Sequence, residues 1–158
     1  MTDLDLNIKD VIDALDSFYC HNVVAGLWAD AVANRLQGIA IYLLSDELPE
    51  VADHARAAAR GLADRIGDLG AVTGDPRQLL DRAPGGIEFT IPDCSDPRAI
   101  TSYALQRLNV IIAAYQDFLD QVRGRDDVSF ALVVGLLAAE DHRRADIEAA
   151  LAGQPGEA

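Results

Sequence analysis

The chain has 158 residues, of which half are hydrophobic and a quarter are charged, and its formal net charge is −13. This composition is ordinary for a globular protein and suffices for one domain with a sizeable core. The acidic balance disfavours direct binding to DNA or RNA, because affinity for phosphate comes mainly from lysine and arginine.

Two cysteines, Cys20 and Cys94, lie far apart without a CxxC pair, which argues against a zinc knuckle and against a disulfide framework. No apolar run is long enough to span a membrane, and the N-terminal residues show no signal-peptide pattern. We therefore expect a cytoplasmic protein without a membrane segment.

Periodic apolar residues predict two long helices in the first half of the chain. In residues 7–36 apolar side chains recur every three or four positions, with Asn22 on the same row. Residues 46–70 repeat the pattern and end at a glycine, a common helix terminator. Between them, residues 39–44 are uniformly apolar, which is compatible with either a strand or a buried connector between helices.

The second half begins with an irregular crossover and ends with two more long helices. Residues 71–96 are rich in proline and glycine, and a short helix is expected at 75–82. Residues 97–123 start with a capping residue and a proline suited to the first turn, and 127–152 form the last helix. Residues 1–158 are thus expected to form a single all-α domain, a four-helix bundle with one long crossover.

Three segments of the chain resemble the Dps or miniferritin branch of the ferritin-like superfamily. Residues 62–71, Leu-Ala-Asp-Arg-Ile-Gly-Asp-Leu-Gly-Ala, are similar to the end of the second helix in Dps proteins. Residues 38–45 resemble the segment between the first two helices, and 146–151 resemble the closing turns of the last helix. The resemblance implies a ferritin-like bundle, self-association into a homo-oligomeric shell, and iron storage or protection against oxidative stress.

The ligand positions that the resemblance implies are mostly replaced. Typical members hold two irons with a glutamate from each of two helices and a Glu-x-x-His from each of the other two. Carried onto this chain, these six positions fall on Asn22, Ala55, Ala58, Leu108, Glu140 and Arg143. Of these, Glu140 alone keeps the family's residue type.

The Dps branch builds its ferroxidase site between subunits, and those positions are replaced as well. They fall near Ala33 and Ser45 and at Arg60 and Asp64, of which only Asp64 is acidic. The resemblance implies iron as cofactor and a ferroxidase activity, while the lost ligands argue against both. Iron and no cofactor at all are therefore kept as equal alternatives. The acidic N-terminus also lacks the lysine-rich tail that many Dps proteins use on DNA.

Glu140 interrupts the apolar row of the last helix, and burying its charge is costly unless it is paired. An arginine is the expected counter-charge. Arg144 is favoured over Arg143, because it lies on the same row four residues later with the glutamate on its N-terminal side. If this pair is buried, replacing Glu140 by alanine is expected to destabilise the fold by about 3–5 kcal/mol. A surviving iron ligand is the alternative role for Glu140.

Glu50 and His54, four residues apart, form a second candidate metal pair, but we favour a solvent-exposed helix face for both. His142 is expected to face outward, and His21, Trp28 and Tyr115 are expected to pack in the core or at a subunit contact. The sequence therefore predicts a shell-forming Dps-like protein with a damaged ferroxidase site. The alternative is a non-enzymatic pseudo-ferritin that acts in assembly or ligand binding without iron.

Overall fold

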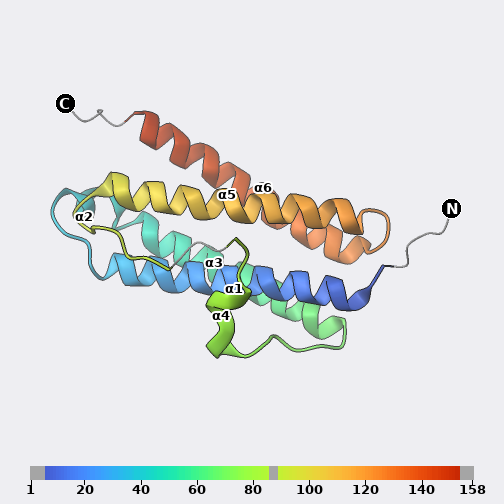
Figure 1. The fold of residues 1–158 in the computed structure, drawn as a ribbon. Helices are drawn as coiled ribbons and strands as arrows, with labels where there is room; N and C mark the ends of the chain where they lie inside the picture. Colours follow the sequence, from blue (N-terminus) through green and yellow to red (C-terminus); the bar gives the residue numbers. More distant parts are fainter. Residues whose placement is uncertain (1–5, 86–88, 154–158) are drawn as a thin grey trace.

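The computed structural model describes residues 6–85 and 89–153, which form a bundle of four long helices (Figure 1). These are α1 (Ile8–Ala33), α3 (Glu47–Asp68), α5 (Pro97–Val122) and α6 (Asp127–Ala152). The shorter helices are α2 (Ile39–Leu44), between α1 and α3, and η1 (Pro76–Gln78) and α4 (Leu79–Arg82) in the crossover. The predicted fold class is confirmed, including the short helix in the crossover.

Capping side chains set the starts of three long helices. Asn7 accepts a hydrogen bond from the Lys9 amide before α1, and Asp96 accepts from two amides in the first turn of α5. Asp126 accepts from the Ser129 amide at the start of α6. Each bond satisfies a donor that the helix itself leaves without a partner. The four long helices begin and end within about one turn of their predicted ranges.

The apolar segment at residues 39–44 is neither a strand nor a buried connector, so that prediction was wrong. It forms α2, in which only Ala40 is buried, and Tyr42 is 85% exposed. A short helix can bury only one face against α3 and α5, and this segment is apolar on every face. The surplus apolar side chains, Ile39, Ile41, Tyr42 and Leu43, therefore lie on the surface.

Helix α1 packs mainly along α3, and α5 packs along α6 (Figure 1). The larger apolar cluster contains Phe18, whose ring makes edge-to-face contacts with Tyr115 and Phe118 at centroid distances of 4.9 and 5.4 Å. The smaller cluster surrounds Trp28 and Ala40. On α1 and α3 the positions that the resemblance assigns to metal ligands, Asn22, Ala55 and Ala58, lie between these two clusters.

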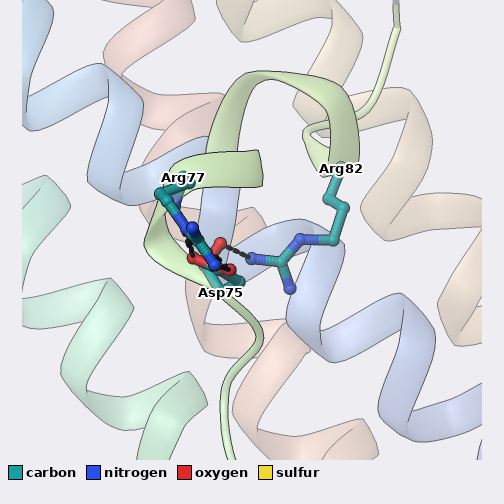
Figure 2. Close-up of polar contacts among 3 residues, drawn as sticks. All are labelled: Asp75, Arg77 and Arg82. Atoms are coloured by element: carbon teal, nitrogen blue, oxygen red, sulfur yellow. Dashed lines mark hydrogen bonds and ion pairs between the residues drawn. The ribbon is translucent and has the colours of Figure 1, made fainter.

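The crossover is held against α1 by polar contacts to Asp16. This carboxylate accepts a hydrogen bond from the Gly74 amide at 3.0 Å and forms an ion pair with Arg82. Figure 2 shows Arg77 folded back onto Asp75, and Arg82 donating to the Asp75 backbone oxygen at 2.8 Å. A side chain at position 74 would require the Arg82 guanidinium to move.

The buried residues of α6 are Ser129, Val133 and Glu140, none of which lies in the C-terminal turns of the helix. The C-terminal end of α6, red in Figure 1, points away from the other long helices. No helix in residues 6–85 and 89–153 combines the length and the apolar character that crossing a membrane requires.

Candidate site in the bundle interior

The middle of the bundle contains a polar side chain from each long helix. Asn22 of α1 donates hydrogen bonds to the Tyr115 hydroxyl of α5 at 3.0 Å and to the Phe18 backbone oxygen at 2.9 Å. Burial raises the pKa of Tyr115 far above its ordinary value; the Asn22 hydrogen bond lowers it and nearby Glu140 raises it. Tyr115 is therefore a neutral phenol at physiological pH, not an anionic metal ligand.

Glu140 of α6 is 4% exposed and faces two basic side chains. Its Oε1 lies 3.1 Å from Nε2 of His54, on α3. Its Oε2 lies 3.6 Å from Nη1 of Arg143, an ion pair that is too long for a hydrogen bond. Oε2 is buried and accepts no hydrogen bond from any residue that the structure describes. The carboxylate is thus held on one oxygen and only electrostatically compensated on the other.

The structure contradicts the preference for Arg144 as the partner of Glu140. Arg144 instead pairs with Asp141 on the surface, at 2.5 Å, while Arg143 takes the position next to Glu140. Helical side chains lean toward the N-terminus, so each arginine meets the carboxylate three residues earlier.

The interpretation of His54 as part of a solvent-exposed face was also wrong. Its side chain is 31% exposed and contacts Glu140, whereas Glu50 is exposed and contributes nothing to this contact. The neighbouring residue, Ala55, is buried. Asp64, the other candidate metal ligand, lies exposed on α3.

The positions at which the resemblance predicts replaced ligands do face inward. Asn22, Ala55, Ala58, Leu108 and Glu140 are all buried. A di-iron centre of the ferritin-like carboxylate proteins requires four carboxylates and two imidazoles. Here the interior offers Glu140 and His54, with a guanidinium beside the carboxylate, and the described residues contain no group of three or more metal-binding side chains. This donor set does not fit two irons.

Two further polar residues, His21 and Arg107, meet at the same level of the bundle. Arg107 Nη2 lies 3.3 Å from Nδ1 of His21, and burial, with a smaller effect of Arg107, lowers the His21 pKa to about 3. His21 is therefore neutral. Arg107 was not predicted as an interior residue, and His54 was predicted to lie on the exposed face of its helix. His54 and Arg107 each immediately precede an inward position, as His21 precedes Asn22. This position in the sequence was the signal from which their contact with the interior could have been predicted.

A partly open cavity of about 100 Å³ lies beside these residues, between α1, α3, α5 and α6. Its wall is mostly apolar and includes Trp28, Leu48, Ile100 and Ile147, and Glu140 and Arg143 lie on one side. The Trp28 ring stacks on Tyr103 at 5.0 Å, and its Nε1 donates to the Thr90 backbone oxygen at 2.9 Å. Trp28 is thereby fixed in position as part of the wall.

No protein-family model and no curated protein matches the sequence, whereas solved structures match nearly all of it. The bacterioferritin-related protein of Bacteroides fragilis, described as a dodecameric thioferritin, is 23% identical with a TM-score of 0.85, over 94% of this chain and 88% of that one. The Dps protein of Vibrio cholerae O1 is 18% identical with a TM-score of 0.83, over 91% and 90%. A mutant of Listeria innocua Dps is 14% identical with a TM-score of 0.81, over 99% of each chain.

The chain has the ferritin-like fold of Dps proteins. The predicted resemblance is thus confirmed for the fold. At these sequence identities, the matched structures show a shared fold and nothing about function. The interior of this ferritin-like bundle contains an Asn22–Tyr115 hydrogen bond and a Glu140 carboxylate between His54 and Arg143.

Proposed function

We propose that this ferritin-like protein assembles into a homo-oligomeric shell and does not oxidise iron inside its bundle. The observation that carries the proposal is the 3.6 Å ion pair between Arg143 and Glu140, at the one interior position that keeps the family's carboxylate. A guanidinium stays charged at all relevant pH values, so it cannot give way to a metal by losing a proton. A divalent cation at Glu140 would face a permanent positive charge.

Self-association is supported by the exposed apolar face of α2, formed by Ile39, Ile41, Tyr42 and Leu43. A contiguous exposed apolar patch on a globular protein commonly marks an interaction surface. The B. fragilis protein of the same fold is described as a dodecamer. Together these observations favour a shell in which α2 contacts a second copy.

Iron can still be the cargo of such a shell. The chain's net charge of −13 provides acidic side chains that bind cations diffusely. In this proposal iron would be stored after oxidation elsewhere, or the shell would include a relative with a complete site. Either route leaves the bundle interior without a role in oxidation.

The iron assay adds Fe(II) to the purified protein in air and follows ferric absorbance. We expect the same rate for buffer, for the unaltered protein and for Glu140→Gln. A faster rate in the unaltered protein that Glu140→Gln abolishes would show an interior ferroxidase site and overturn the proposal.

The assembly assay measures the mass of the particle in solution by light scattering after gel filtration. Tyr42→Glu is expected to reduce the mass, because it places a charge in the apolar face of α2. Glu50→Gln, an exposed change in the first turn of the next helix, is the matched control and should keep the mass unchanged. A monomer or simple dimer for the unaltered protein would contradict the shell.

A second candidate function is ligand binding by a pseudo-ferritin scaffold without iron. The specific observation that favours it is the largely apolar cavity beside Glu140. Small-molecule sites are typically concave and apolar with a few fixed polar groups, which describes this cavity.

A further inference from the structure

The cavity beside Trp28 is lined by small side chains from three of the four long helices. Ala25 of α1, Ala55 of α3 and Ala104 of α5 all line it, and each of these side chains ends at Cβ. Protein interiors contain few voids larger than a water molecule, so a mostly apolar space of about 100 Å³ is an exception to ordinary packing. An enclosed apolar cavity of about 150 Å³ in another protein stays dry and binds benzene. A space of this kind therefore suits a small apolar molecule, which leaves water and gains contact with the wall.

Three polar side chains on the cavity wall already donate hydrogen bonds within the protein. Asn22 and the Trp28 indole donate the bonds described above. The Thr101 hydroxyl donates to the Pro97 backbone oxygen at 2.7 Å. A polar ligand would have to compete with these bonds, and its own polar group would lose its bonds to water on entering the cavity. The wall therefore favours a ligand without polar groups.

The charged side chains on the wall are equal in number and opposite in sign. Glu47 and Glu140 contribute two negative charges, and Arg107 and Arg143 contribute two positive ones. Glu140 is paired with Arg143, and its Oε2 is buried, so a ligand in the cavity does not reach that oxygen. The His21 imidazole is neutral, because burial lowers its pKa to about 3. A charged ligand would therefore meet no excess of opposite charge, and its burial would be costly.

We infer that this cavity binds one small, uncharged and apolar molecule, about the size of a six-membered ring, through contact with the apolar wall alone. The inference deepens the ligand-binding alternative and rests on the proposal that no iron occupies the interior. Its chemical signature is selection against polar and charged groups on a ring of the same size.

Binding of toluene to the full-length protein tests the inference by calorimetry, with circular dichroism as the check of folding. We expect toluene to bind once per chain and about tenfold or more tighter than phenol, whose hydroxyl would lose its bonds to water. Benzoate, which carries a charge on the same ring, should show no measurable binding. Ala104→Leu fills space at the cavity wall and should weaken toluene about tenfold or more. The matched control is Ala113→Leu, at an exposed position of the same helix, and it should bind toluene as the unaltered protein does.

A second measurement locates the bound toluene without any variant. In isoleucine-methyl NMR spectra, toluene should shift the signals of Ile100 and Ile147, which line the cavity. The signals of Ile66 and Ile111, in the larger apolar cluster, should stay unchanged. Each of the following results would overturn the inference: no saturable binding of toluene, phenol or benzoate binding as tightly as toluene, unchanged affinity in a folded Ala104→Leu variant, or shifts centred on Ile66 and Ile111. The iron assay on the same preparation keeps the two proposals apart, because ferroxidase activity contradicts the proposed function, whereas a lack of toluene binding contradicts this inference alone.

Discussion

Helix α6 and its N-cap residue carry two largely buried carboxylates that contact α3, and the two are stabilised in different ways. Asp126 precedes the first turn and accepts hydrogen bonds on Oδ1 from the Ser129 amide at 3.0 Å and from Arg65 at 2.9 Å. Arg65 also donates to the Ser129 hydroxyl at 2.9 Å. Glu140, nearly four turns later, has one contact at 3.1 Å to His54 and a longer ion pair to Arg143.

The difference shows which of the two buried charges contributes more to the fold. Burial alone raises the pKa of Asp126, but hydrogen bonds from Ser129 and the charge of Arg65 lower it below its ordinary value. That carboxylate both caps a helix and joins two helices. Glu140 contributes no cap, and its one contact within hydrogen-bond distance is to His54. Each carboxylate has a second buried oxygen without a hydrogen bond from the described residues, Oδ2 of Asp126 and Oε2 of Glu140. The two therefore differ in how many donors hold the other oxygen.

The largest expected effect comes from breaking the Asp126 contacts. Arg65→Met should reduce the free energy of unfolding by about 3–5 kcal/mol, because it leaves a largely buried carboxylate without its cation. The measurement is urea unfolding followed by circular dichroism. Arg144→Met is the matched control, since that pair lies on the surface and should change stability by less than about 1 kcal/mol. Equal losses in the two variants would show that the Asp126 contacts have no special weight.

As the pH falls, His21 should reduce the stability of the fold before the Asp126 contacts are lost. The His21 pKa falls from 6.5 to about 3 in the folded state, so the unfolded chain takes up the proton first as the pH decreases. Stability should decline from about pH 6.5 toward pH 3, with a slope of up to about 1.4 kcal/mol per pH unit. The lowered pKa of Asp126 means that its contribution is present above its ordinary 3.8 and is lost only as the pH falls through the lower folded value.

Unfolding curves at several pH values check this order. His21→Leu should flatten the decline between pH 6 and 4, whereas the exposed His142→Gln should retain it. If His21→Leu keeps the full slope, the decline has another origin.

The smallest of the expected effects concerns Arg143. Arg143→Met should cost about 1–2 kcal/mol, less than Arg65→Met, because Glu140 keeps its contact to His54 and the lost ion pair is long and 22% exposed on the arginine side. Adding Glu140→Gln should recover part of this loss, since no buried charge then lacks a partner. A double variant less stable than Arg143→Met would contradict this account of the pair.

The sequence predicted the helices well because their apolar spacing and their caps are local properties. Ala55, Leu108 and Glu140 were placed inward correctly by spacing alone. His54 and Arg107 were misjudged or missed, because a long side chain beside an inward position reaches the interior when its neighbour is small or when the helix is rotated slightly. The choice between Arg143 and Arg144 follows the direction in which side chains lean along α6, which spacing alone did not predict. The exposure of α2 likewise depends on which helices pack against it, and this is a tertiary property.

Trp28 is the single tryptophan of the chain, and it lies at the cavity rather than in the cluster around Phe18. Its emission is therefore a site-specific optical reporter, whereas far-ultraviolet circular dichroism averages over every helix. Coincident unfolding curves from the two signals would mean that the bundle melts as one cooperative unit. An earlier fluorescence transition would mean that the cavity end opens while the rest of the bundle is still folded, which gives a ligand a route inward.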